Sequence, residues 1–241
     1  MKNLGAEHEN LDHKVHRQIK SMILEQKLKP GAKIYQEKLA LDLGISRTPL
    51  VNALKKLEQE RLIMAIPRRG FYVRQFSKQE MVGIFELREV LEGLAARRAS
   101  LRISNDQVRK LQGFFREFKA SDDTRSIKRY AAEDRRFHNF LIEMGGDELM
   151  SSILEAYSII TFSYLGEFRG GLVRPPKETL SEHRAIIEAI TEKDPEEAEQ
   201  AARLHLKRSR EKLSKELDKE EHRSQSLTMN PSREERSLHE D

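Results

Sequence analysis

The stretch from residue 36 to residue 57 constrains the fold of this chain more than any other. It reads QEKLALDLGISRTPLVNALKKL, two short helical patterns separated by a glycine. Gly44 is the kind of residue that ends a helix, because glycine tolerates a positive φ. The sequence therefore predicts a helix over about 36–42, a tight turn, and a second helix capped by Ser46.

The second of these helices has an apolar stripe and a polar face. The stripe consists of Leu50, Ala53, Leu54 and Leu57. The residues expected to point away from the core, or to lie at the exposed start of the helix, are Ser46, Arg47, Thr48, Val51, Asn52 and Lys55. An exposed polar helix start after a tight turn is typical of a helix that enters the major groove of DNA.

The flanking sequence extends this unit to residues 8–75. An amphipathic pattern over about 12–27 precedes it, and the runs LIMAI and GFYVR follow as two strands around PRRG. Arg68 and Arg69 are expected at the tip of that hairpin. Residues 13–74 carry 14 Lys and Arg against 5 Asp and Glu, a charge that suits a polyanion. The pattern predicts a winged helix-turn-helix, and the alternative is a small helical module that binds protein.

LALDLGISRTPLVNALKKLEQERLI followed by PRRGFYV resembles the DNA-binding domain of the GntR family of bacterial transcription regulators. In that family the helix usually continues Pro-Val-Arg-Glu-Ala-Leu, and its arginine reads bases. Here Val51 stands in place of the arginine and Asn52 in place of the glutamate. A valine suits a thymine methyl and an asparagine suits an adenine edge, so we expect an operator shifted towards A·T at this position.

Residues 76–216 have the pattern of six helices with short links, which predicts an antiparallel all-α bundle. Ser77 and Glu80 have the spacing of a capping box, SNDQ opens a helix at 104, and Asp194-Pro195 opens the last helix. The fold class is therefore mainly α, with a winged helix-turn-helix before the bundle. Residues 217–241 are polar, and we expect them to be disordered.

Four polar residues stand in apolar helical stripes of the bundle. They are Asp134, His138, His183 and His205. Each histidine alone is ordinarily a core residue with a satisfied ring. Together, four buried groups of this kind without partners would be costly, and one divalent metal would satisfy them all. The donor set suits Zn²⁺, Ni²⁺ or Mn²⁺ and does not select among them.

The Asp-x3-His pair in EDRRFHNF, with the histidines of LSEHRAII and AARLHL, resembles the FCD effector-binding domain of the FadR subfamily of GntR regulators. The resemblance implies a metal that binds a small carboxylate effector such as lactate, pyruvate or a sugar acid. Arg88 and Tyr164 are candidates for contact with that effector. The alternatives are an internal salt bridge of Arg88, for instance with Glu92, and core packing of Tyr164.

These observations favour a metabolite-responsive transcription repressor of a metabolic operon, and not an enzyme. We expect a homodimer that reads a pseudo-palindromic double-stranded operator. The first alternative is a metal-dependent enzyme with a DNA-binding anchor. The second alternative is a nucleoid-type DNA binder. The chain has no cysteine and no apolar stretch long enough to span a membrane, so a cytoplasmic location is expected.

Overall fold

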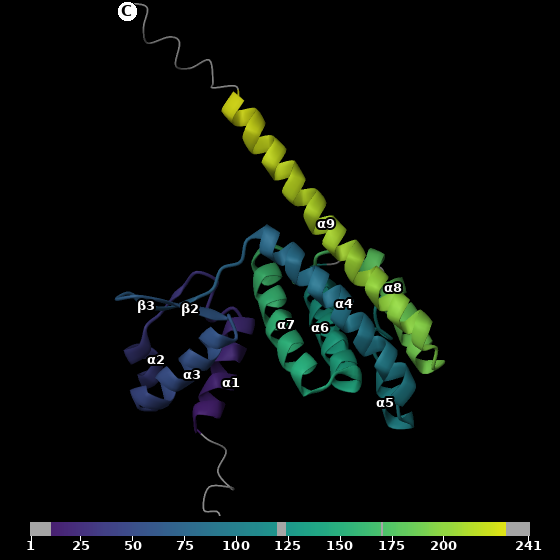
Figure 1. Cartoon of the computed structure of the whole chain (residues 1–241), viewed down its shortest axis with the longest axis horizontal. Coiled ribbons are helices and arrows are strands. Elements are labelled where there is room, and N and C mark those ends of the chain that lie inside the picture. The colour runs from purple at the N-terminus through teal and green to yellow at the C-terminus, as the bar shows by residue number, and fades with distance from the viewer. Residues whose placement is uncertain (1–10, 120–123, 170, 230–241) are drawn as a thin grey trace, which may run out of the picture.

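The chain folds into a small unit of helices and sheet followed by a bundle of longer helices (Figure 1). The computed structural model describes residues 11–119, 124–169 and 171–229. Helices predominate, as the sequence predicts. Within the described residues, no helix combines the length and apolarity needed to cross a membrane.

The first unit has the order of elements of a winged helix-turn-helix. Its elements are α1 (Leu11–Leu24), β1 (Lys33–Ile34), α2 (Gln36–Asp42), α3 (Arg47–Gln59), β2 (Ile63–Ile66) and β3 (Gly70–Val73). The sheet is antiparallel in the order β1-β3-β2, and Ile34 pairs with Phe71 while Ile66 pairs with Gly70. Strand β1 has only two residues, too few to show an alternating pattern in the sequence.

The turn between α2 and α3 has the geometry that the glycine predicts. Gly44 has a φ of 64°, its N–H donates to the carbonyl of Leu41, and the N–H of Ile45 donates to the carbonyl of Ala40. This pair of hydrogen bonds is a Schellman motif. Ser46 has the extended backbone of an N-cap residue, but its side chain makes no capping hydrogen bond, so the predicted side-chain cap is wrong.

Six helices of the described chain form the second unit. They are α4 (Lys78–Arg102), α5 (Asn105–Leu111), α6 (Thr124–Gly145), α7 (Glu148–Arg169), α8 (Pro176–Thr191) and α9 (Pro195–Met229). Capping boxes start α4 and α5, and Asp194 accepts the N–H of Glu197 at the start of α9. The three helix starts predicted from these residues are confirmed.

Helix α9 continues past the bundle in Figure 1 and ends at Met229. The expected disordered tail over 217–241 is therefore wrong for residues 217–229, and the remainder lies outside the described residues. The physical reason is that Lys, Glu, Leu, Gln and Arg have high helix propensity, and no glycine or proline interrupts the sequence before Pro231. Polarity alone does not exclude a helix.

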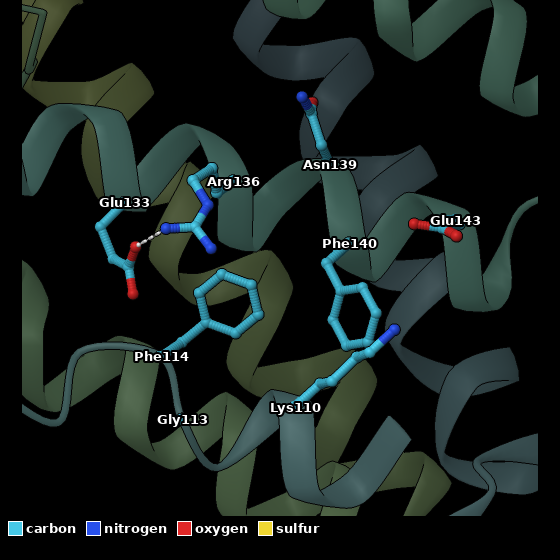
Figure 2. A pocket seen from close by; sticks show the side chains of 8 residues that line it. All are labelled: Lys110, Gly113, Phe114, Glu133, Arg136, Asn139, Phe140 and Glu143. Atoms are coloured by element: carbon cyan, nitrogen blue, oxygen red, sulfur yellow. Dashed lines mark hydrogen bonds and ion pairs between the residues drawn. The ribbon is translucent and has the colours of Figure 1, made fainter. Parts of the chain in front are cut away.

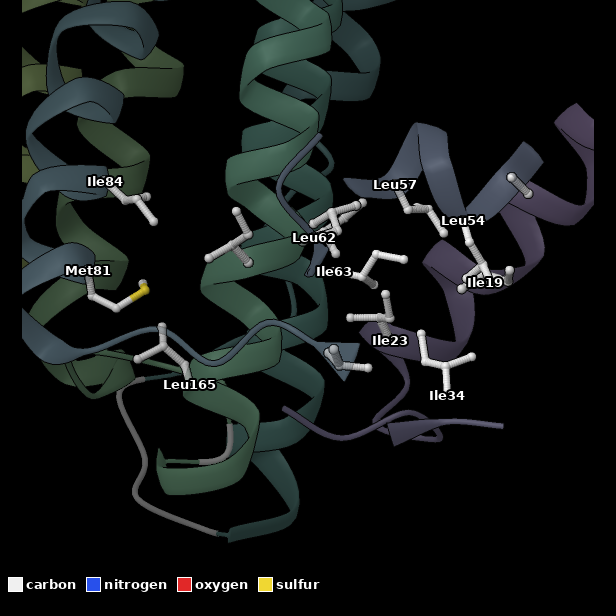
Figure 3. Close-up of a cluster of buried hydrophobic side chains, with 14 of the residues drawn as sticks. Ile19, Ile23, Ile34, Leu54, Leu57, Leu62, Ile63, Met81, Ile84 and Leu165 are labelled. Atoms are coloured by element: carbon white, nitrogen blue, oxygen red, sulfur yellow. The ribbon is translucent and has the colours of Figure 1, made fainter. Parts of the chain in front are cut away.

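The apolar core of the first unit continues into the bundle (Figure 3). Ile23 of α1 and Leu57 of α3 belong to the same buried cluster as Met81 of α4 and Leu165 of α7. A polar contact reinforces this junction, since Lys20 of α1 lies 3.3 Å from Glu155 of α7. The two units therefore share a packed interface and are not joined by a linker alone.

Candidate functional site

Asp134, His138, His183 and His205 converge inside the bundle. Helix α6 carries the first two one turn apart, α8 carries His183, and α9 carries His205. One ligand atom from each of the four lies within 4.8 Å of the others. Nε2 of His183 is 3.2 Å from Oδ1 of Asp134 and 3.3 Å from Nε2 of His205. Helices far apart in sequence thus place four donors around one point.

The other ring nitrogen of each histidine has a hydrogen-bond partner outside this point. Nδ1 of His138 lies 2.6 Å from Glu92, and Nδ1 of His205 lies 2.9 Å from Glu182. A carboxylate accepts a hydrogen bond, so in both rings the proton belongs on Nδ1 and the lone pair of Nε2 points to the centre. This is the orientation that a metal-binding histidine requires.

Arginines hold both of these carboxylates in place. Nε of Arg88 donates to Glu92 at 2.6 Å, and Arg174 donates to both oxygens of Glu182 at 2.9 and 2.5 Å. Burial alone would raise the pKa of Glu92, but the charge of Arg88 and the hydrogen bonds from His138 and Arg88 outweigh it and lower that pKa to about 2. Hydrogen bonds from His205 and Arg174 likewise overcome burial and hold the pKa of Glu182 well below its usual range. Both groups are ionised at neutral pH.

The third histidine is positioned by aromatic and hydroxyl groups. The ring of Phe115 stacks on His183 with centroids 4.4 Å apart, and Phe115 adopts a left-handed φ of 57° that is rare for a bulky residue. Nδ1 of His183 lies 2.9 Å from the hydroxyl of Tyr130, which in turn lies 2.9 Å from Thr179. These contacts fix the ring plane of His183.

The protonation states at the centre suit a divalent cation. Burial lowers the pKa of His205 to about 3 and lowers that of His183 as well, so both rings are neutral at pH 7. Burial opposes ionisation of Asp134, but the hydrogen bond from His183 and the nearby histidines keep its pKa well below the usual range. Three imidazoles and one carboxylate are a donor set that Zn²⁺, Ni²⁺ and Mn²⁺ accept.

A cavity of about 30 Å³ adjoins three of the four donors, Asp134, His138 and His205. Arg88, Arg174 and Thr161 line it together with apolar residues of α4, α7 and α9. Oγ1 of Thr161 is a buried polar atom without a hydrogen-bond partner in the described chain. The space accommodates about one or two water molecules or the head of a very small ligand, and the two guanidinium groups at its wall are paired with Glu92 and Glu182.

The two residues expected to contact an effector differ in their positions. Arg88 lines the cavity. It also forms the salt bridge with Glu92 that the sequence offered as the alternative to contact with an effector. Tyr164 is not among the residues that line the cavity, and it packs against the apolar cluster shared by the two units. The sequence analysis missed Arg174, although a charged residue within the apolar run LVRPP was a usable signal.

A larger hollow of about 580 Å³ lies outside the bundle core (Figure 2). Glu133 and Glu143, two carboxylates of the helix that carries Asp134 and His138, line this hollow and not the smaller cavity. Figure 2 shows Glu133 paired with Arg136, and the two groups are 3.0 Å apart. Neither carboxylate is placed to serve as an acid or base beside the four-donor cluster.

The predicted DNA-facing residues lie on the surface of the first unit. Ser46, Arg47, Thr48, Asn52, Lys55, Arg68 and Arg69 are exposed, and Val51 is half-buried. The amide of Asn52 donates to Asp12 of α1 at 3.0 Å, and Arg47 lies 3.4 Å from Glu37 of α2. Contact of Asn52 with a base would therefore require its release from Asp12.

Comparison with known proteins assigns both units. Residues 11–73 match the model of bacterial regulatory proteins of the gntR family, and residues 83–208 match the FCD domain. The chain belongs to the GntR family and carries an FCD domain. The GntR assignment makes it a transcription regulator that binds DNA, and the FCD domain is the unit that contains the four metal-ligand candidates. The family is not one of enzymes.

Individual relatives agree with the GntR assignment. The HTH-type transcriptional regulator YdhC of Bacillus subtilis is 27% identical over 213 residues, covering 84% of this chain and 91% of the relative. The HTH-type transcriptional repressor RspR of Escherichia coli is 24% identical, and the match covers 81% of this chain and 86% of the relative. The solved structure of Escherichia coli McbR/YncC has the same fold, with a TM-score of 0.70 at 19% identity, and the match covers 87% of this chain and all of that one.

Proposed function

We propose that this GntR regulator is a homodimeric repressor of a metabolic operon, of the FadR subfamily, and that a small carboxylate bound at its metal centre alters operator binding. The observation that carries the proposal is the set of four convergent donors whose outer hydrogen bonds orient them towards one point. RspR, a relative of similar length, is named a repressor. The DNA-binding part is proposed to end at residue 75 and the effector part to span 76–216.

The proposed roles follow from the charges around the cavity. A bound divalent ion would supply a cation with coordination positions open to a carboxylate oxygen. Arg88 and Arg174 bring guanidinium groups to the cavity wall, each paired with a carboxylate, and Thr161 offers a hydroxyl without a partner in the described chain. A guanidinium and a hydroxyl are suitable donors to a carboxylate. Since the cavity is small, lactate- or pyruvate-sized acids fit this proposal better than large ones.

Helix α7 provides a physical route from this cavity to the DNA-binding unit. Thr161 and Leu165 of α7 line the cavity, and Leu165 also belongs to the cluster that packs against α1 and α3. Glu155 of the same helix faces Lys20. A ligand that binds one position of α7 better than another would therefore change how the DNA-binding unit is held.

The test is release of operator DNA from the purified protein. Small carboxylates are added to the metal-loaded protein and to protein treated with a chelator, and binding is followed by fluorescence anisotropy. We expect one acid to weaken binding at least tenfold in the loaded protein and to have no effect after chelation. His183→Ala should behave like the chelated protein, and the exposed His13→Ala should behave like wild type. Operator binding that responds to no small acid would refute the effector role.

A further inference from the structure

His183 differs from the other two histidines of the cluster in the partner of its Nδ1 atom. Nδ1 of His138 and Nδ1 of His205 each meet a carboxylate, which only accepts hydrogen bonds. Nδ1 of His183 instead lies 2.9 Å from the hydroxyl of Tyr130. A hydroxyl can donate or accept, so this partner is compatible with a proton on either nitrogen of His183.

The contacts of Nε2 determine where the proton of His183 lies in this arrangement. Nε2 is 3.2 Å from Oδ1 of Asp134, which is an acceptor, and 3.3 Å from Nε2 of His205. Glu182 holds the proton of His205 on Nδ1, so Nε2 of His205 presents a lone pair. Both contacts are favourable only if Nε2 of His183 carries the proton. Its Nδ1 is then unprotonated and accepts the hydroxyl proton of Tyr130.

Binding of a cation by His183 requires the opposite arrangement of its proton. A histidine binds a metal through an unprotonated nitrogen, and Nε2 is the nitrogen that faces Asp134 and His205. The ring proton then belongs on Nδ1, where it is donated to the oxygen of Tyr130. One proton leaves Nε2 for water and one passes from water to Nδ1, so the ring carries the same number of protons in both arrangements.

Thr179 allows Tyr130 to change from donor to acceptor. When Tyr130 donates to His183, its oxygen can accept the hydroxyl proton of Thr179, 2.9 Å away. When Nδ1–H of His183 occupies that oxygen, the hydroxyl of Tyr130 can donate to Thr179 instead. Thr179 can then donate to the carbonyl of Pro175 at 3.5 Å. The two hydroxyl groups therefore give each donor an acceptor in both arrangements.

Burial makes these partners necessary. Tyr130 and His183 are fully buried, and Thr179 is 4% exposed. A buried donor without an acceptor costs the free energy of its desolvation. A carboxylate beside Nδ1 of His183 would satisfy only the cation-bound arrangement, because it cannot donate to an unprotonated nitrogen. The hydroxyl pair of Tyr130 and Thr179 satisfies both.

We propose that the protonated nitrogen of His183 changes from Nε2 to Nδ1 when a divalent cation binds, and that Tyr130 and Thr179 reverse their hydrogen bonds at the same time. Both are positioning residues, since they act on the cation through His183. The cluster can then release its cation without leaving a buried donor unpaired, so the ion is exchangeable and is not needed for folding. This proposal rests on the metal centre of the proposed function and concerns how that centre is regulated.

The first test locates the ring proton by NMR of the full chain labelled with nitrogen-15 in histidine. Nitrogen chemical shifts distinguish a protonated from an unprotonated ring nitrogen, and the signals of each histidine are identified by their loss in the corresponding glutamine variant. In protein treated with a chelator, we expect the proton of His183 on Nε2. After one equivalent of Zn²⁺ is added, we expect it on Nδ1. The protons of His138 and His205 should be on Nδ1 in both samples.

The second test is Thr179→Val, which removes an acceptor that only the cation-bound arrangement needs. In the chelated variant Tyr130 can still donate to His183, but after Zn²⁺ binds its hydroxyl has no acceptor. The affinity for Zn²⁺, measured by competition with a chromophoric chelator, should fall about tenfold. The melting temperature of the chelated protein should fall by less than about 3 °C. Thr191→Val on the same helix is the control, because its hydroxyl bonds backbone carbonyls; it should leave the Zn²⁺ affinity unchanged.

Several results would overturn this proposal. They are a proton on Nδ1, or on both nitrogens, of His183 in the chelated protein, and a proton that stays on Nε2 after Zn²⁺ binds. Wild-type Zn²⁺ affinity in Thr179→Val would contradict the role of the hydroxyl pair, and unfolding of the wild type on chelation would show that the ion is structural. The proposed function fails separately: the proton can move as expected while no carboxylate releases operator DNA, and the reverse result is equally distinguishable.

Discussion

Nδ1 of His138 lies 2.6 Å from Glu92, and the same carboxylate accepts a 2.6 Å hydrogen bond from Arg88. One buried residue of α4 thus orients a metal-ligand candidate of α6 and neutralises an arginine at the cavity wall. Glu182 has the equivalent position between Arg174 and His205. The centre is therefore supported by two arginine–carboxylate–histidine chains.

Glu92→Gln should weaken metal binding by about 10- to 100-fold, because the amide is a poorer acceptor for Nδ1–H of His138. It should also destabilise the protein, since Arg88 would remain buried beside a neutral group. Metal affinity can be measured by competition with a chromophoric chelator. The exposed Glu86→Gln on the same helix is the control. Unchanged zinc affinity in Glu92→Gln would show that the Glu92 carboxylate does not support metal binding through His138.

Thr161→Val tests the hydroxyl at the cavity. The residue is buried and its Oγ1 lacks a partner in the described chain, so the isosteric valine should stabilise the effector-free protein by about 1 kcal/mol. The same change should reduce the increase in melting temperature caused by the effector. Both quantities come from thermal denaturation with and without the carboxylate. Thr191→Val, whose hydroxyl bonds backbone carbonyls, should only lose stability. An effector response as large as that of wild type would contradict the role of Thr161.

The junction between the units should respond to acid through Glu60. Glu60 faces His16 at 3.0 Å and Lys20 at 3.1 Å, and Lys20 also faces Glu155. Burial opposes the charge of Glu60, but these partners outweigh it, so its pKa is lowered on folding. A lowered pKa stabilises the fold above the unfolded value of about 4.5 and ceases to do so as the pH falls through the folded pKa.

Glu60→Gln should accordingly lose about 2 kcal/mol of unfolding free energy at pH 7, the usual range for a hydrogen bond to a charged group. The difference from wild type should shrink as the pH falls below about 4.5. Urea denaturation between pH 7 and 3.5 measures both effects, and the exposed Glu211→Gln on α9 is the control. A difference that stays constant over this range would rule out the assignment to Glu60.

The β2–β3 hairpin and helix α3 should contribute two separable effects to DNA binding. Arg68→Ala and Arg69→Ala should each weaken binding to all DNA sequences by a similar factor. Each should also reduce the slope of log affinity against log salt concentration by about 1, as expected for phosphate contacts. Val51→Arg should instead move the preferred base pair at one position from A·T to G·C. Selection of binding sites from random DNA, followed by salt titrations, measures both. An essential G·C pair opposite Val51 in wild type, unchanged in Val51→Ala, would mean that Val51 does not read that base.

Local patterns of the sequence account for the helix-turn-helix and for most element boundaries. Gly44 determines the turn because few other residues tolerate its φ, and Ser77 and Ser104 start helices through contacts only three residues away. The four metal-ligand candidates were also identifiable, since polar residues in apolar stripes must meet inside a bundle. The turn and the helix starts depend on contacts between residues close in sequence. The ligand candidates can be identified because the sequence shows which face of each helix is buried.

The tertiary structure alone decided the partners of these residues. Glu92 lies 46 residues from His138 and Glu182 lies 23 from His205, and neither pairing has a periodic signal in the sequence. The same holds for Asn52 with Asp12, and for His16, which had no predicted role and is buried beside Glu60. Such contacts depend on how helices cross, which is set by packing across the whole core. Helical periodicity specifies only which side of each helix faces inward.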